Sequence, residues 1–160
     1  MPTMTFKATT RKLPTGLAVE GEARGFKVIM DEPPKLGGSD TGMTPVELML
    51  VALGGCQVIV ASAFASAQGV DLQDIWVELE GDLDPMGFTQ GAPGVRMGFQ
   101  EIRLTLHMKS DSPPEKLEAL AEFIASRCPV EDNLVNHTRI VAQPIVIEPA
   151  TPEPTVAESV

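Results

Sequence analysis

The segment from Leu48 to Ala67 constrains this chain most, because it is apolar apart from one glutamine and two serines. Thr44 is the predicted N-cap, Pro45 stands at the first helical position, Glu47 completes a capping box and Gly69 is the predicted end. A helix that is apolar on every face needs cover on all sides. Since one 160-residue chain has little material for that cover, we expect a partner subunit to supply part of it.

The same segment is long enough to cross a bilayer, which is the alternative to a buried helix. Glu47 and Asp71 flank it, however, and no Lys or Arg lies near either end to set a membrane topology. Its interior is also rich in glycine and alanine. We therefore expect a helix enclosed by protein rather than by lipid.

Length and charge narrow the class of protein. The 160 residues fit one domain, which we place at residues 1–148, followed by a proline-rich tail at 149–160 that we expect to be flexible. A net charge of −10 leaves no basic surface for nucleic acid or anionic membrane. The first residues show no apolar stretch behind a basic one, so a cytoplasmic location is expected.

Hydrophobic periodicity predicts an α+β fold. Apolar and polar residues alternate in several short segments, whereas the apolar positions of two others recur at helical spacing. The predicted order is three strands, the long helix, two strands, a helix capped at Ser112, a short helix and a final strand, at residues 4–10, 17–23, 26–30, 44–69, 75–80, 102–109, 112–127, 129–136 and 140–147. Residues 32–43 and 84–98 are rich in glycine and proline and are predicted to be loops.

The two cysteines are the residues with the most chemical potential. Cys56 lies in the middle of the long helix, directly after Gly54 and Gly55, and paired glycines there indicate the close approach of another element. Cys128 precedes Pro129 and so is predicted at the N-cap of a short helix. At that position the helix dipole and free backbone amides favour a thiolate.

Two other interpretations of the cysteines stay open. Each could be a small buried hydrophobic residue, since free cysteine is among the most buried residue types. Cys56 and Cys128 could also join His107 and His137 in a zinc site. No pair has the short ligand spacing typical of such sites, and His107 falls on the polar face of its strand. We expect no metal and no other cofactor.

Three segments carry a family resemblance. Thr44-Pro45-Val46-Glu47-Leu48, Leu53-Gly54-Gly55-Cys56 and Cys128-Pro129-Val130 resemble the OsmC/Ohr family of thiol peroxidases, and the order of elements over residues 4–148 agrees. The glycine-rich loop at 37–42 is similar to that of the general OsmC-like branch. The resemblance implies an intertwined homodimer in which sheets from both chains enclose the two long helices.

The resemblance also implies roles for individual residues. Cys56 would be the peroxidatic thiol, Cys128 the resolving thiol, and Glu47 the carboxylate that orients an arginine toward the thiolate. That arginine would be Arg11, in preference to Arg24. The implied oxidising substrate is a small peroxide, with organic hydroperoxides preferred to hydrogen peroxide. The implied reducing substrate is a thiol or a dithiol.

Helix geometry restricts how Glu47 and Cys56 can cooperate. Nine helical residues correspond to about 900° of rotation and about 13.5 Å of rise, so the two side chains of one helix point to opposite sides. If both serve one site, Glu47 has to come from the other subunit. The alternative is that Glu47 only caps the helix.

A function from a different class also fits the composition. Only 4% of the residues are aromatic and eight are methionine, a combination suited to an adaptable apolar pocket. The alternative to a peroxidase is therefore a non-catalytic OsmC-like dimer that binds a small apolar ligand.

Overall fold

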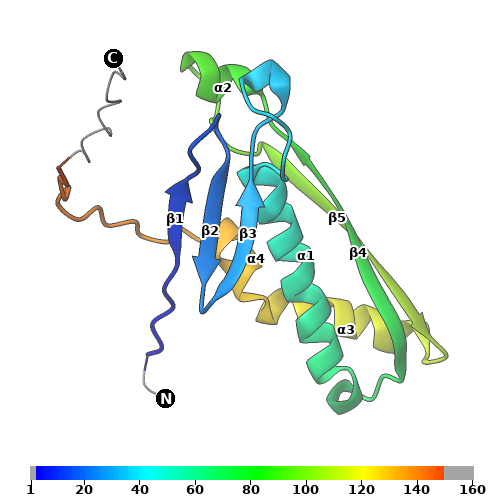
Figure 1. Ribbon diagram of the computed structural model, residues 1–160. Helices are drawn as coiled ribbons and strands as arrows, with labels where there is room; N and C mark the ends of the chain where they lie inside the picture. Colours follow the sequence, from blue (N-terminus) through cyan, green and yellow to red (C-terminus); the bar gives the residue numbers. More distant parts are fainter. Residues whose placement is uncertain (1–2, 150–160) are drawn as a thin grey trace, which may run out of the picture.

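Two antiparallel sheets and a long helix between them make up the fold, as the computed structural model of residues 3–149 shows (Figure 1). The elements are β1 (Thr9–Lys12), β2 (Val19–Ala23), β3 (Phe26–Met30), α1 (Pro45–Phe64), β4 (Leu72–Asp82), α2 (Pro85–Gln90), β5 (Glu101–Ser110), α3 (Pro114–Arg127) and α4 (Pro129–Val135). Short 3-10 turns lie at Pro34–Leu36 and Ser66–Gln68. The mixed α+β architecture predicted from the sequence is confirmed.

The sheets follow the predicted alternation, with shifted ends. Strands β1, β2 and β3 form one antiparallel sheet in chain order, and β4 pairs with β5 along its length, with Val77 opposite Leu106. The first strand begins at Thr9, not Met4, and Phe6 is exposed. Residues 4–8, where apolar and polar side chains alternate, therefore pair with no strand within the described part of the chain.

The predicted start of α1 is confirmed. The Thr44 hydroxyl oxygen accepts a hydrogen bond from the Glu47 backbone N–H at 3.3 Å. The Glu47 carboxylate in turn accepts from the Thr44 backbone N–H at 2.7 Å and from the Thr44 hydroxyl at 2.9 Å. This reciprocal capping box satisfies backbone donors that a helix leaves free at its first turn. Beyond Phe64 a 3-10 turn continues to Gly69, which adopts the left-handed conformation.

A buried aspartate organises the loop that leads into α1. Asp31 is 2% exposed and accepts hydrogen bonds from the backbone N–H groups of Glu32, Ser39 and Thr41 and from the Thr41 hydroxyl. Burial alone would raise the pKa of Asp31, but these hydrogen bonds lower it below its ordinary value. The loop folds tightly enough that Gly38 packs directly on the Glu32 backbone.

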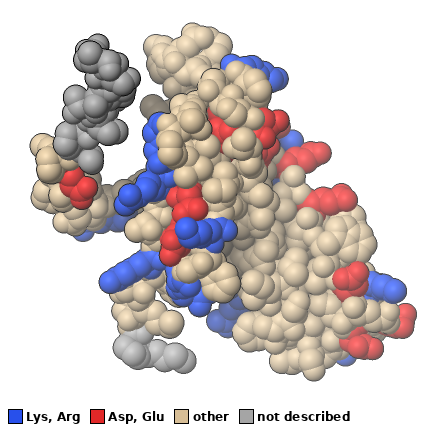
Figure 2. Space-filling model, in the orientation of Figure 1, with Lys and Arg blue, Asp and Glu red and all other residues tan. Residues whose placement is uncertain are grey.

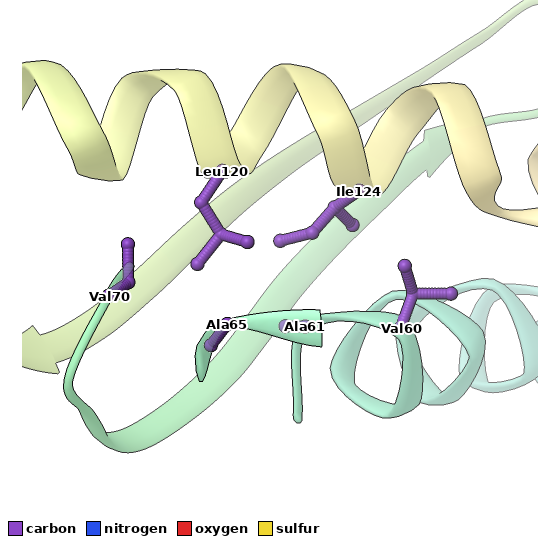
Figure 3. Close-up of a cluster of buried hydrophobic side chains, with 6 residues drawn as sticks. All are labelled: Val60, Ala61, Ala65, Val70, Leu120 and Ile124. Atoms are coloured by element: carbon purple, nitrogen blue, oxygen red, sulfur yellow. The ribbon is translucent and has the colours of Figure 1, made fainter. Parts of the chain in front are cut away.

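The hydrophobic core lies between α1, α3 and the β4–β5 ribbon. Figure 3 shows Leu120 and Ile124 of α3 pointing toward Val60, Ala61 and Ala65, with Val70 beside them. Partly buried side chains of the ribbon, among them Ile75, Leu106 and Met108, pack against this cluster. Cys56 also borders it.

One face of α1 has no cover among residues 3–149. Ile59 is 69% exposed, and Val51 on the same face is also exposed although both belong to the most apolar helix of the fold. Few charged side chains lie over this face in Figure 2. Of the helices in residues 3–149, α1 is the one long and apolar enough to cross a membrane, a test that core helices also pass.

The predicted final strand is wrong. Residues 140–147 form no strand, and Ile140, Ile145 and Ile147 are each about nine-tenths exposed. Their β-branched composition suits a strand, but they pair with no strand within residues 3–149. The predicted tail, residues 149–160, lies outside the described residues except for Pro149.

Two local predictions also need correction. Pro113, not Ser112, is the N-cap of α3, and no side chain caps that helix. The Ser112 hydroxyl instead accepts a hydrogen bond from the Asp71 backbone N–H at 3.0 Å, which ties the start of β4 to the end of β5. The predicted loop at 84–98 contains α2, because the Asp84 carboxylate caps it by accepting from the Met86 N–H at 2.9 Å.

The loop before α1 tolerates no side chain at position 38. A Cβ there would overlap the Glu32 carbonyl oxygen, so Gly38→Ala should lower the free energy of unfolding by about 1–3 kcal/mol. Gly98→Ala is the matched control, because a Cβ at that position meets open space, and we expect a change within about 0.5 kcal/mol. Urea unfolding of both variants measures the difference; equal stabilities would contradict this account of the loop.

Candidate active site

The structure brings Cys56 and Cys128 together. Cys128 ends α3 and caps α4, because its extended backbone (φ −84°, ψ 105°) breaks the helix before Pro129. Both α3 and α4 pack on α1, which carries Cys56. The two thiols are free and lie close enough together that Cys56 raises the pKa of Cys128. They are therefore close enough to react with one another after oxidation of either.

The environment of Cys128 keeps its proton on sulfur. Cys128 is 2% exposed, and burial raises the pKa of its thiol, as do the hydrogen bond and the like charge of Cys56. Its sulfur accepts from the Glu131 N–H at 3.4 Å, but this bond and one from Val130 offset only part of the shift. The expectation that the N-cap position favours a thiolate at Cys128 is wrong, since burial outweighs the helix dipole.

Cys56 has the more accessible sulfur. It is only partly buried, whereas Cys128 is enclosed. The greater accessibility of Cys56 agrees with the role of attacking thiol that the sequence resemblance implies for it, and that role stays a prediction.

The two glycines before Cys56 have different surroundings. A Cβ at Gly54 would lie 2.8 Å from Leu79 Cδ1 of β4, so the prediction that another element approaches closely here is confirmed for Gly54. A Cβ at Gly55 would meet nothing within 4 Å in the single chain. Gly54 therefore seats the helix on its sheet, and Gly55 belongs to the uncovered face.

Glu47 lies in the first turn of α1, well before Cys56 in the middle of the helix. Among the described residues, its carboxylate accepts hydrogen bonds from the backbone N–H and the hydroxyl of Thr44. Nine helical residues, about 13.5 Å of rise, separate it from Cys56. Within one chain Glu47 is a capping residue, and a role at the thiols stays a prediction that requires a second subunit.

Neither candidate arginine reaches the thiols within the described part of one chain. Arg11 is exposed on β1, opposite Glu20 in the sheet register. Arg24 lies in the turn between β2 and β3 with a positive φ of 55°, and its guanidinium stands 5.6 Å from the centre of the Phe26 ring. The role proposed for Arg11 stays a prediction.

The zinc alternative gains no support from the structure. The His107 ring stacks on Trp76 with ring centres 4.6 Å apart, and its Nε2 lies 3.3 Å from the Glu78 carboxylate on the β4–β5 ribbon. Within residues 3–149, no three or more His, Cys, Asp or Glu side chains gather where they could hold a metal ion.

Two residues that the sequence patterns did not indicate border the thiol pair. Gln57 is 1% exposed, and its Nε2 donates to the Glu131 carboxylate at 2.9 Å. The Gln57 amide oxygen is buried and has no partner in the described chain. The one available signal was a glutamine directly after the cysteine in an otherwise apolar run; nothing in the sequence indicated Glu131.

An apolar pocket of about 410 Å³ opens at the start of α1. It lies between α2 and the loop that precedes α1, and Pro45, Val46, Phe88 and Met97 are among its lining residues. Cys56 and Cys128 do not line it. The pocket adjoins the helical turn that carries Glu47.

The family follows from comparison with known proteins. The model of the OsmC-like protein family matches residues 37–142, more than half of the chain. The chain therefore belongs to the OsmC-like family, as the motifs around both cysteines indicated. No curated protein matches the chain.

Solved structures share the fold at low sequence identity. An OsmC-like protein from Mycoplasma pneumoniae has a TM-score of 0.72 and 18% identity, covering 84% of this chain and 89% of its own. An organic hydroperoxide resistance protein OsmC from Legionella pneumophila has a TM-score of 0.59 and 21% identity, with coverages of 84% and 91%. An OsmC-like hydroperoxide resistance protein from Jannaschia has a TM-score of 0.52 and 21% identity, covering 87% and 91%.

The raised pKa of Cys128 predicts a stability that depends on pH. A thiol whose pKa is higher in the folded than in the unfolded state stabilises the fold fully below the unfolded value, about 8.5. That contribution is lost as pH rises through the folded pKa. Urea unfolding under reducing conditions should show that the free energy of unfolding of the wild type falls between pH 7.5 and 10.5. Cys128→Ser should lack this fall. An equal loss in both proteins would contradict the raised pKa.

Proposed function

We propose that this protein is a cysteine-based thiol peroxidase that reduces organic hydroperoxides through a Cys56 thiolate and a Cys56–Cys128 disulfide. The contact between the two thiols is the observation that carries the proposal, together with the burial that keeps Cys128 protonated. Membership of the OsmC-like family supports it. So does the description of similar folds as hydroperoxide resistance proteins.

The reaction balances with these two residues and one reductant. The Cys56 thiolate attacks the terminal peroxide oxygen, the O–O bond breaks, and the alkoxide takes up a proton and leaves as an alcohol. The resulting Cys56 sulfenic acid is attacked by the Cys128 sulfur, so that the S–O bond breaks and water leaves with the Cys128 proton. A thiol or dithiol of the cytoplasm then supplies two electrons and two protons to the disulfide.

We also propose that the working unit is an intertwined homodimer. The uncovered face of α1 carries Val51 and Ile59, which a second copy would bury. The extended segment 140–147 presents β-branched side chains without a strand partner, and in Figure 1 it runs away from the body of the fold beyond β1. A second copy of the chain could cover the apolar face of α1 and pair with the extended segment at the same time.

In such a dimer the active site would be shared. Glu47 is separated from Cys56 of its own chain by nine helical residues, so the carboxylate near a given thiol pair would come from the partner. Arg11, exposed on β1, would be the arginine held by Glu47 against the thiolate. A positive charge there lowers the pKa of the attacking thiol.

One observation favours the second candidate function, binding of a small apolar ligand without catalysis. The 410 Å³ pocket between α2 and the start of α1 is lined largely by apolar side chains, among them Phe88 and Met97, and lies apart from the thiols of the same chain. A protein with this function alone would keep both thiols after exposure to peroxide.

Replacing each cysteine separates their roles. Cys56→Ser should abolish peroxide reduction, because no nucleophile is left to attack the O–O bond. Cys128→Ser should complete one turnover and stop at the sulfenic acid when no other thiol is present. Consumption of tert-butyl hydroperoxide measures both, with circular dichroism as the folding control. Equal residual turnover in the two variants would contradict the assigned roles.

Mixing two inactive chains tests the shared site. A Glu47→Ala chain combined with a Cys56→Ser chain should regain activity, since one of the two sites in the mixed dimer holds an intact Glu47 and an intact Cys56. Activity of the mixture, relative to each homodimer, is the measurement. If Glu47 only caps the helix, Glu47→Ala will cost about 0.5–2 kcal/mol of stability and keep wild-type turnover. An inactive mixture would contradict the cross-subunit arrangement.

A further inference from the structure

We propose that Gln57 and Glu131 form a positioning pair that holds Cys128 against Cys56 for disulfide formation. The inference rests on the proposed function and adds two residues to it. Gln57 directly follows Cys56 in α1, and Glu131 is the third residue after Cys128 in α4. A bond between them therefore joins the two elements that carry the thiols.

The contacts place Glu131 at the centre of this link. Its carboxylate accepts from Gln57 Nε2 at 2.9 Å, and its backbone N–H donates to the Cys128 sulfur at 3.4 Å. The same residue thus contacts α1 through its side chain and the resolving thiol through its backbone. A hydrogen bond to a charged acceptor is stronger than one between neutral groups, and the burial of Gln57 shields it from water.

The bond is the one side-chain hydrogen bond between α1 and α4 among residues 3–149. Helix α4 spans only Pro129–Val135, and helices this short are marginal without tertiary contacts. Its first turn fixes the Cys128 sulfur through the Glu131 N–H. The placement of that turn against α1 therefore depends on the Gln57–Glu131 bond.

The buried amide oxygen of Gln57 supports a functional reason for this residue. That oxygen has no partner in the described chain, and a buried unpaired acceptor costs stability. An apolar side chain at this core position would avoid the cost. A glutamine at this position is explained by the hydrogen bond that its side-chain N–H group donates to Glu131.

The pair acts on the second chemical step alone. Of the two cysteines, only Cys56 takes part in the attack on the peroxide, and it belongs to the 20-residue helix α1. Attack of Cys128 on the oxidised Cys56 needs the two Cα atoms within the narrow range that a disulfide permits, about 4.4–6.8 Å. A small displacement of α4 lowers the fraction of time spent in that range, so disulfide formation slows while sulfenic acid formation does not.

A glutathione redox buffer tests the pair without any peroxide. The equilibrium between the Cys56–Cys128 dithiol and its disulfide reports the effective concentration of one thiol at the other. Gln57→Leu should lower that effective concentration about tenfold, because the link between α1 and α4 is lost. Gln73→Leu is the matched control: Gln73 also donates to a carboxylate, that of Asp111 at 3.0 Å, but on the exposed surface. It should match the wild type.

An exchange of the two residues tests the bond itself. Gln57→Glu alone places two carboxylates together and should lower the effective concentration at least as much as Gln57→Leu. Adding Glu131→Gln to it restores a bond of reversed direction, so the double variant should return toward the wild-type value. The proposal is overturned if Gln57→Leu matches Gln73→Leu, or if a folded double variant stays at the level of Gln57→Glu. If Gln57→Leu fails to fold, the comparison of Gln57→Glu with the double variant decides whether the proposal holds.

Peroxide kinetics then separate this inference from the proposed function. With tert-butyl hydroperoxide, Gln57→Leu should form the Cys56 sulfenic acid at the wild-type rate and the disulfide about tenfold more slowly. If wild-type protein does not react with peroxide, the peroxidase proposal fails, while the glutathione equilibrium still decides whether the pair positions Cys128. If the rates of both steps fall equally, the pair is a general structural contact and the inference fails.

Discussion

The cover of helix α1 is the constraint on which the rest of the structure depends. One face of this apolar helix lies on β4, where Gly54 permits close approach to Leu79, and its second half packs against α3. Its start is fixed by the capping box and by the loop that Asp31 organises. The face with Val51 and Ile59 has no cover among the described residues, and the proposed dimer would supply it.

The chemistry of the site follows from the same packing. Placing α3 on α1 buries the junction before Pro129, and Cys128 is buried with it next to Cys56. Burial raises the pKa of the Cys128 thiol, while Cys56 stays more accessible. The different roles proposed for the two cysteines rest on this difference.

Features encoded locally could be predicted from the sequence. The capping box at Thr44, the alternation of apolar and polar residues within β4 and β5, and the helix break at Cys128 each depend on residues a few positions apart. Features set by distant contacts could not. The Gln57–Glu131 bond joins residues 74 positions apart, and the pKa of Cys128 depends on burial that its N-cap position does not indicate. The segment 140–147 has strand composition, but it pairs with no strand among the described residues.

The most direct measurement is a titration of reduced wild-type protein with one equivalent of tert-butyl hydroperoxide, without any reductant. Free thiols are counted, the alcohol product is quantified, and peptides are mapped by mass spectrometry. The account predicts that both thiols disappear together, that one alcohol forms per chain, and that Cys56 and Cys128 are found in one disulfide-linked peptide pair. Two thiols that stay free, with no alcohol formed, would contradict the proposed peroxidase.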